Sequence, residues 1–306
     1  MKWLFCIFFV FIAADIGAQE KKTPVYYFNP HWSPNGRTIV FESTLGGKSA
    51  IYTIFADGSN LRQLTDPATT AGQPRFSRDG KQIVFYSERD GHLQLFVMNA
   101  DSSGQRKLSD TADLDYLPDF SPHGDYVVFQ SRAERPAIAH DIYIIRTDGS
   151  GRTRLTDGNF GYTAPKFSPD GKRIVFNRTV IPKKYYRELT RDEMQQMKNS
   201  EEIFVMNTDG TNQKNLTNNE VEDSSPQWSK NGKTIYFISG RGGSPNVYAM
   251  NTDGSNVRKI ADGKIVTNPF ISPDEKFFAY TKEVDGKWAV YVYEIKTGKA
   301  RVLVGN

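Results

Sequence analysis

One short pattern returns six times along this chain, and it limits the possible folds more than any other feature. The pattern is a proline, any residue, an aromatic or aliphatic residue, and a serine. We call it the anchor, and its copies begin at Pro30, Pro74, Pro118, Pro165, Pro226 and Pro269. Successive copies are separated by 44, 44, 47, 61 and 43 residues. A period of about 40–45 residues is the length of one four-stranded propeller blade.

Every copy continues in a similar way after its anchor. A glycine stands six residues after the proline in five copies, and Glu275 takes its place in the sixth. A tight turn that needs positive φ explains this glycine. Two apolar strands follow, such as Val127–Phe129 and Ile142–Ile145, and then an Asp-Gly turn and a short closing strand. Each copy therefore predicts one antiparallel sheet of four strands.

The fold that we predict is all-β, a six-bladed β-propeller of four-stranded antiparallel blades. Six sheets stacked around an axis bury one another's faces and leave few free edges. An aromatic residue stands eleven positions after each proline, and we expect it to pack between blades. These residues are Phe41, Phe85, Phe129, Phe176, Phe237 and Tyr280. Two ways of closing the ring stay open: contact between the first and last blades, or a strand at Val25–Phe28 that joins the last blade.

The first 18 residues have the pattern of a secretory signal peptide. Lys2 supplies the positive end, Trp3–Ala14 is apolar, and small residues at Gly17 and Ala18 precede the expected cleavage point. The only cysteine lies inside this segment, so the mature chain, residues 19–306, has no disulfide. No later stretch is apolar enough to predict a transmembrane segment. We therefore expect one propeller domain that is periplasmic or secreted.

The fourth repeat is the longest because it contains an insertion. The segment that includes Tyr185 and Tyr186 is basic and aromatic, and Thr190 and Glu193 then form a capping-box pattern. This pattern predicts a short helix over Arg191–Asn199. A neutral insertion on a rigid scaffold and an element that docks a partner are both compatible with it.

Strand alternation predicts two different faces. The two turns of each blade lie on one face, the turn face. The other loops of each blade and the connections between blades lie on the opposite face, the loop face, and they vary in sequence. Variable loops on a rigid scaffold are typical of binding sites, and arginine and tyrosine are favoured interface residues. The candidate partner-binding residues on the loop face are Arg89, Arg132, Arg178, Arg241, Asp115, Tyr116, Tyr162, Tyr185, Tyr186 and Asp223. Structural pairing of the arginines with nearby acids is the alternative.

Motifs of catalysis are missing from the sequence. It has no Gly-x-Ser-x-Gly nucleophile elbow, no His-Glu-x-x-His and no glycine-rich phosphate loop. The histidines are scattered, and only His140, next to Asp141 on a variable loop, is a weak candidate for metal binding or acid–base chemistry. The net charge of +4 is spread without long runs, which does not favour nucleic acid. We predict no catalytic residues, no cofactor and no metal.

The repeats resemble those of a known family. Phe167–Lys172, followed by Ile174–Phe176 and by Asn207–Gly210, looks like the WD40-like PD40 repeat of TolB-type propellers. The resemblance extends over about residues 24–306, and it implies a six-bladed propeller in the periplasm. Because the first anchor follows so soon after the signal, we expect a free-standing propeller without the separate N-terminal domain of TolB.

The resemblance also bears on function. It implies a non-catalytic scaffold that binds an envelope protein or peptide, or else a saccharide. We also expect the protein to be a monomer. The alternatives are a polysaccharide- or oligosaccharide-binding protein or lyase on the same fold, and the propeller part of a peptidase. The lyases that resemble this repeat use clustered histidines around a metal, and the peptidases carry a hydrolase domain after the propeller. We predict neither feature here.

Overall fold

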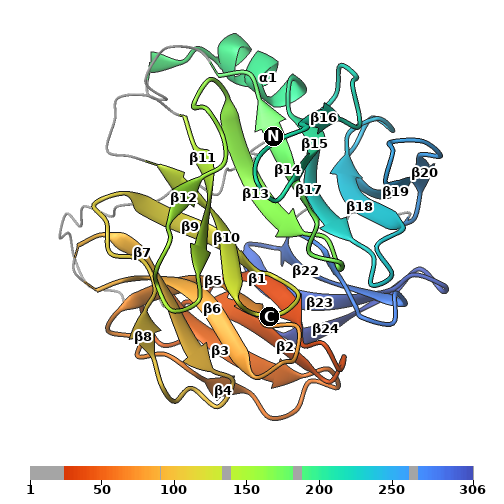
Figure 1. Cartoon of the computed structure of the whole chain (residues 1–306). Coiled ribbons are helices and arrows are strands. Elements are labelled where there is room, and N and C mark those ends of the chain that lie inside the picture. The colour runs from red at the N-terminus through yellow and green to blue at the C-terminus, as the bar shows by residue number, and fades with distance from the viewer. Residues whose placement is uncertain (1–23, 90, 133–138, 182–187, 262–267, 306) are drawn as a thin grey trace.

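The computed structural model describes residues 24–89, 91–132, 139–181, 188–261 and 268–305. These residues form six sheets around one axis, and each sheet contains four antiparallel strands that pair in chain order (Figure 1). The predicted six-bladed propeller is therefore confirmed. Within the described residues, no helix is long and apolar enough to cross a membrane.

Each blade begins with the strand nearest the axis and ends with an outer strand, which is short in blades one to five. Blade one holds β1 (Tyr27–Trp32), β2 (Thr38–Ser43), β3 (Ala50–Phe55) and β4 (Arg62–Gln63). Blade two holds β5 (Thr70–Phe76), β6 (Gln82–Glu88), β7 (Leu93–Asn99) and β8 (Arg106–Lys107). Blade three holds β9 (Leu114–Phe120), β10 (Tyr126–Arg132), β11 (Asp141–Arg146) and β12 (Thr153–Arg154).

The other three blades repeat this plan. Blade four holds β13 (Gly161–Phe167), β14 (Arg173–Thr179), β15 (Glu202–Asn207) and β16 (Lys214–Asn215). Blade five holds β17 (Asp223–Trp228), β18 (Thr234–Ser239), β19 (Asn246–Asn251) and β20 (Arg258–Lys259). Blade six holds β21 (Phe270–Ile271), β22 (Phe277–Val284), β23 (Lys287–Glu294) and β24 (Lys299–Val304).

The hydrophobic core is divided among the boundaries between blades. Each core cluster combines residues of two neighbouring blades, and the six boundaries each have one. At the boundary between blades two and three, for example, Val84 and Leu95 pack with Phe120 and Phe129. All six aromatic residues of the eleventh position are buried. No blade can therefore bury its apolar side chains without its neighbours.

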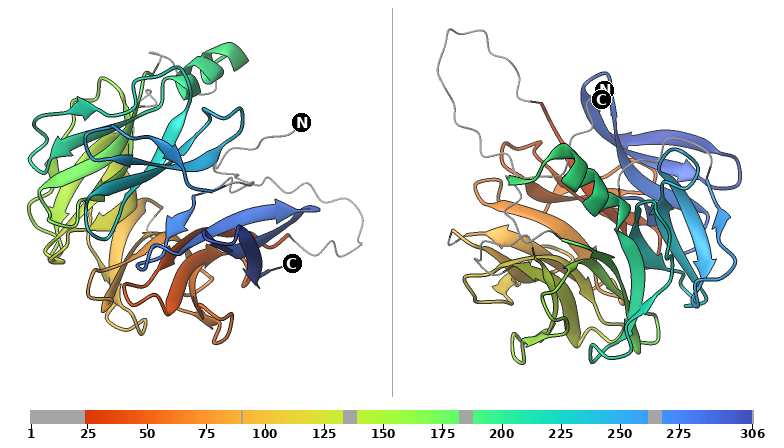
Figure 2. Two further views of the ribbon diagram at one scale, coloured as in Figure 1. Left: turned by 90° about the vertical axis from the view of Figure 1, so that its right-hand side faces the viewer. Right: turned by 90° about the horizontal axis from the view of Figure 1, so that it is seen from above.

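The ring closes by direct contact between blades one and six, which lie side by side in Figure 2. Trp32 Nε1 donates a hydrogen bond of 3.1 Å to the carbonyl oxygen of Phe270. The two blades also share one core cluster, in which Phe41 packs with Ala279 and Val290. The segment around Tyr26 pairs with blade one, because the Thr44 N–H donates to the Tyr26 carbonyl. Of the two closures that the sequence left open, contact is the observed one.

The first turn of each blade is closed by its own anchor serine. In blade one, Ser33 Oγ accepts a hydrogen bond from the Thr38 N–H at 2.9 Å and donates to Asn35 Oδ1 at 2.8 Å. The glycine of this turn, Gly36, has a φ of 71°, a conformation in which a Cβ is strained. Since antiparallel strands alternate in direction, both turns of every blade lie on the turn face.

In blade six the first turn has no glycine, and hydrogen bonds to a neighbouring blade support the residue that replaces it. Glu275 replaces the glycine with a φ of 59°. In the turn of blade five, Lys230 stands where four other blades have proline, so it carries an N–H that proline lacks. Glu275 accepts a hydrogen bond from that N–H at 3.1 Å and another from the Tyr236 hydroxyl at 2.9 Å. The two exceptions to the repeat therefore support each other.

Helix α1 (Arg191–Asn199) connects β14 to β15 and so belongs to the loop face of blade four. Its bounds and its capping box are those predicted. The Glu193 N–H donates to Thr190 Oγ1 at 3.2 Å, and the Thr190 N–H donates to Glu193 Oε2 at 2.9 Å. None of its residues is buried.

Candidate functional site

The residue between the proline and the aromatic or aliphatic residue of each anchor lies at the propeller axis. We call these six the axial layer: His31, Arg75, Asp119, Lys166, Gln227 and Phe270. Side chains from non-neighbouring blades meet here. The guanidinium carbon of Arg75 lies 4.2 Å from the centre of the Phe270 ring, and the His31 ring centre lies 5.1 Å from that of Phe270. Blades one, two and six are thus in contact through these side chains.

A repeated backbone irregularity precedes the axial layer. The residue before each anchor proline has positive φ although none is glycine. The values are 52° at Asn29, 51° at Gln73, 52° at Leu117, 51° at Ala164, 56° at Ser225 and 39° at Asn268. In blades one to five the pairing of the first two strands also shifts register at this point. Such bulges re-aim side chains, and here the side chain that follows the proline is turned towards the axis.

The axial layer alternates between two kinds of hydrogen bonding. In blades one, three and five the side chain accepts from a backbone N–H of the next blade. His31 Nδ1 accepts from Phe76 at 3.5 Å, Asp119 Oδ2 from Phe167 at 3.1 Å, and Gln227 Oε1 from Ile271 at 3.1 Å. In blades two and four, Arg75 and Lys166 instead donate to the carbonyl oxygen of their own anchor proline, at 2.8 and 3.0 Å.

Burial shifts the proton equilibria of this layer. It lowers the pKa of Lys166 to about 8 and that of Arg75 to about 10, against the opposing attraction of Asp119. Burial also holds the pKa of His31 well below its usual value, and the positive charges of Arg75 and Lys166 add to this effect, so His31 is neutral at pH 7. The pKa of Asp119 is raised by burial, although Lys166 and Arg75 oppose the rise.

A second polar layer lies on the loop side of the axial layer. Asn268 Nδ2 donates to Asn29 Oδ1 at 3.2 Å, and Asn29 Nδ2 donates to Glu42 Oε2 at 3.1 Å. The Gln73 N–H donates to the same Glu42 oxygen at 3.1 Å. A Cβ on Gly72 would collide with the Glu42 carboxylate and with the hydroxyl of Tyr86. Glycine at this position therefore permits the close approach on which the second layer depends.

Three of the four arginines predicted on the loop face, Arg89, Arg178 and Arg241, stack on aromatic rings. The guanidinium carbon of Arg89 lies 4.2 Å from the centre of the Phe96 ring, and that of Arg178 lies 3.9 Å from the Phe204 ring. Both rings belong to the third strand of the same blade as the arginine. These contacts direct the guanidinium groups along their blades. Arg132 lies close enough to His140 to lower the pKa of that histidine, which burial chiefly brings to about 4.

Three other candidate residues are buried within the molecule. Asp115 and Asp223 are 0% exposed, and Tyr162 is 1% exposed. Asp115 accepts a hydrogen bond from Arg152 at 3.2 Å. Tyr116 is half-buried, and its ring packs edge-on against His140. Tyr185 and Tyr186 lie outside the described residues.

Sequence reasoning missed Arg152, which occupies in blade three the place that Arg89 has in blade two. Its guanidinium carbon lies 4.0 Å from the Tyr143 ring centre, and it forms ion pairs with Asp113 and Asp115. Arg152 precedes the fourth strand, whereas Arg89 follows the second. A search for the same residue at the same repeat position could not find it.

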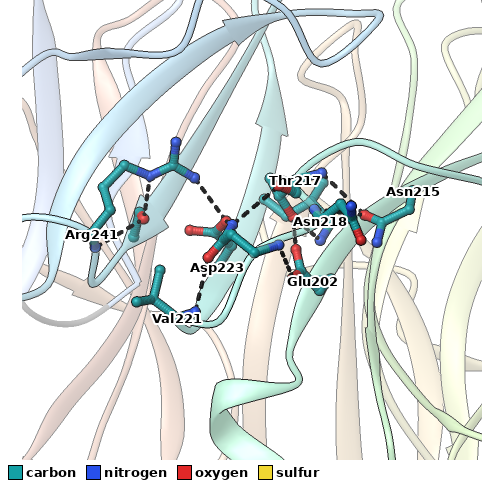
Figure 3. Close-up of polar contacts among 10 residues, drawn as sticks. Glu202, Asn215, Thr217, Asn218, Val221, Asp223 and Arg241 are labelled. Atoms are coloured by element: carbon teal, nitrogen blue, oxygen red, sulfur yellow. Dashed lines mark hydrogen bonds and ion pairs between the residues drawn. The ribbon is translucent and has the colours of Figure 1, made fainter.

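Blades four and five are joined by the polar network shown in Figure 3. Arg241 Nη2 donates to Asp223 Oδ2 at 2.8 Å, and Asn219 Nδ2 donates to the same oxygen at 2.6 Å. The Asn219 N–H also donates to Glu202 Oε1 at 2.6 Å, and Thr217 Oγ1 bonds the same carboxylate. The connection between these blades is thus held by side chains from both.

Glu201 lies beside that network. Asn177 Nδ2 donates to its Oε1 at 2.6 Å. Burial, together with the nearby carboxylate of Glu222, raises the pKa of Glu201 to about 7. In the described part of the chain, no three His, Cys, Asp or Glu side chains are grouped in a way that could hold a metal ion.

Two grooves lie between blades on the turn face. The first has a volume of about 610 Å³ and lies mainly between blades one and six, with Trp32, Asp57 and Arg301 in its lining. The second, of about 440 Å³, lies between blades one and two. The turn face is therefore hollowed at blade boundaries, although its turns are uniform in sequence.

Comparison with known proteins places these features in a family. The model of the TolB β-propeller domain, PD40, matches residues 12–140 and 187–305. A putative TolB of Agrobacterium tumefaciens has a similar structure, with 24% identity, a TM-score of 0.66, and coverage of 84% of this chain and 90% of that one. An oligogalacturonate lyase in complex with manganese is 13% identical with a TM-score of 0.63, over 90% of this chain and 77% of that one.

A curated relative matches a shorter stretch. Dipeptidyl-peptidase 5 of Porphyromonas gingivalis is 43% identical over 88 residues, which is 28% of this chain and 13% of the peptidase. The structural neighbours, at these identities, establish the fold alone. The family model covers most of the chain, and its repeats are those seen in the structure, so the chain belongs to the TolB β-propeller family.

Proposed function

We propose that this protein is an exported, non-catalytic propeller of the cell envelope that binds a protein or peptide through its loop face. Residues 1–18 act as a cleaved signal peptide in this proposal, and the mature protein is a monomer in the periplasm or outside the cell. The resemblance to TolB propellers supports the location and the class of partner.

The observation that carries the proposal is the difference between the two faces. On the turn face, the anchor serines close similar turns in all six blades, for example through Ser77 and Asp79 in blade two. On the loop face, blade four carries α1 with no buried residue, and the connections differ from blade to blade. Surface variation on a rigid scaffold is where binding specificity usually lies.

Site-specific photocrosslinking tests the proposal. A photoreactive residue is placed at Gln196, which is exposed on α1, and a matched one at Lys81, which is exposed on the turn face. Crosslinking in intact cells should join a specific protein or peptide to position 196 and not to position 81. The proposal fails if a specific partner is joined only through position 81, or if position 196 gives no product above the uncrosslinked background.

A catalytic alternative is tested separately, because lyases share the fold. The purified protein is incubated with oligogalacturonate, with and without Mn²⁺, and unsaturated product is measured. Our proposal predicts no product in either case. Product formation that depends on Mn²⁺ and is lost in His140→Ala would replace the binding proposal with a lyase.

A further inference from the structure

Two buried cations at the axis are not in direct contact with a carboxylate of the described residues. Arg75 is 2% exposed and Lys166 is 8% exposed. Each donates one hydrogen bond, to the carbonyl oxygen of its own anchor proline. Neither forms an ion pair with a carboxylate in the described part of the chain. The Nε atom of Arg75 is buried and has no partner among those residues. The axial layer thus holds more hydrogen-bond donors than acceptors.

The carboxyl groups near these cations do not pair with them. Asp119 attracts both cations and Glu42 attracts Arg75, but neither carboxyl group forms an ion pair with them in the described residues, and burial raises the pKa of both. One oxygen of Asp119 is already bonded to the Phe167 N–H at 3.1 Å. His31 is neutral at pH 7, as shown above. Burying a charge without an ion pair is costly, so an anion that entered this layer could form the direct contact with Arg75 and Lys166 that no described carboxylate makes.

The other residues of the axial layer support the two cations without neutralising them, which favours the binding of an anion. The Phe270 ring supports the guanidinium group of Arg75. Gln227 has both ends of its amide engaged, with Ile271 and Pro269, so it does not neutralise either cation. His31 and Asp119 keep a small part of their surface exposed, so solvent reaches the layer at these two residues.

The layer is closer to the turn face than to the loop face. His31 is the second-last residue of β1, directly before the turn of blade one, and the second polar layer lies two residues further towards the loops. Arg78 is exposed in the turn of blade two. Its positive charge acts on both His31 and Asp119. A third cation therefore stands at the turn-face end of the axis, where it attracts anions towards the layer.

We propose that the turn-face end of the axis is a site for a carboxylate group, which Arg75 and Lys166 bind together and to which Arg78 guides it. The two cations lie close enough for the charge of Arg75 to lower the pKa of Lys166, and a guanidinium and an ammonium group together suit the two oxygens of a carboxylate. The near-complete cover of both cations restricts the site to a small group. The site is at the opposite end of the axis from the loop face, so it stands or falls independently of the proposed function.

NMR titration of the full mature protein tests the site. The protein is kept at pH 7 in a buffer with low chloride, and the backbone amides of Phe76 and Phe167 are followed. One arm adds sodium acetate; the other adds a short peptide with a free C-terminal carboxylate, or its amidated form. Saturable shifts with acetate indicate a site for free carboxylates. Saturable shifts with the free-acid peptide alone indicate a site for a peptide terminus, and both results support the proposal.

Variants make the test specific. We expect Lys166→Met to weaken carboxylate affinity at least tenfold, and Arg146→Met, which removes an arginine stacked on the Tyr126 ring, to leave it unchanged. Raising the pH from 7 to 9.5 should weaken binding to the wild type, because Lys166 has a pKa of about 8 in the free protein. The proposal is overturned if neither arm shows saturable shifts, or if a folded Lys166→Met variant binds as tightly as the wild type.

Discussion

The six blades agree at one position of the repeat and disagree at another. Eleven residues after the anchor proline, five blades carry phenylalanine and one carries tyrosine, and all six rings are buried between blades. Directly after the proline, the same blades carry six different residues, namely His31, Arg75, Asp119, Lys166, Gln227 and Phe270. The space between each pair of blades is filled by a ring of similar size. Packing therefore keeps the eleventh position after the proline uniform.

The axial position cannot be uniform, because its six side chains meet one another. Six copies of Arg75 would place like charges together in a buried space, which is strongly unfavourable. The chain instead combines cations, an anion, an amide and an aromatic ring. In this chain the repeats therefore differ at the axis, and the axial layer gathers chemically distinct side chains in one place.

The largest effect should come from the uniform position. Phe129→Ala should lower the free energy of unfolding by about 3–5 kcal/mol, because it leaves a cavity between blades two and three. The measurement is urea denaturation followed by tryptophan fluorescence. Phe55→Ala is the matched control, since Phe55 is 41% exposed, and it should change stability by no more than about 0.5 kcal/mol. Equal effects of the two substitutions would contradict the packing role.

Substitution in the axial layer should instead raise the free energy of unfolding. Lys166→Met removes a buried charge that forms no ion pair among the described residues, so it should stabilise the protein by about 1–3 kcal/mol at pH 7. Burial lowers the pKa of Lys166 from 10.5 to about 8. Between these values the unfolded chain holds more protons than the native protein, so wild-type stability rises with pH there.

The variant lacks this rise, and its advantage should shrink as the pH increases from 8 to 10.5. Denaturation curves of both proteins across this range provide the check. A destabilised Lys166→Met variant, or an advantage that does not depend on pH, would show that the lysine is adequately paired.

The loop side of blade four should show a smaller effect with the reverse pH dependence. The pKa of Glu201 is raised from 4.5 to about 7, so the native protein holds more protons than the unfolded chain between these values. Its contribution is fully present below pH 4.5 and is lost as the pH rises through 7. Glu201→Gln cannot ionise and keeps the hydrogen bond from Asn177. The free energy of unfolding of this variant should therefore fall by about 1–2 kcal/mol less than that of the wild type as the pH rises through this range. Glu283→Gln, at an exposed site, should leave the pH profile of stability unchanged.

The smallest effect is expected at the exposed helix. Thr190→Ala removes the N-cap of α1 and should destabilise the helix by about 0.5–1 kcal/mol without shifting global unfolding. Hydrogen exchange at amides 191–199 should become faster, and Thr190→Ser should restore it. A shift of the global unfolding midpoint would mean that α1 is part of the core, contrary to its exposure.

Prediction from the sequence succeeded where one position has one physical cause. The repeat gave the blades, and the capping box gave the bounds of α1, because both depend on local patterns that recur or stand close in the chain. The axial layer was overlooked because His31, Arg75 and Lys166 lie 44 and 91 residues apart and share only their place in the anchor. Arg152 was missed because blades two and three supply the stacked arginine from different strands.

The burial of Asp115, Asp223 and Tyr162 was also beyond sequence reasoning. Acidic residues in variable connections are usually solvated. Here each acid is paired with an arginine that reaches it from elsewhere in its blade, as Arg152 reaches Asp115 and Arg241 reaches Asp223.

Titration of the Lys166 ammonium group by NMR tests the contrast between axis and blades most directly. The signal is assigned by comparison with Lys166→Met, and the exposed Lys81 serves as internal reference. We predict a pKa of about 8 for Lys166 in the free protein, and an upward shift when a carboxylate binds. A pKa near the ordinary lysine value of 10.5, unchanged by added carboxylate, would contradict the view that the axis holds a buried cation without an ion pair.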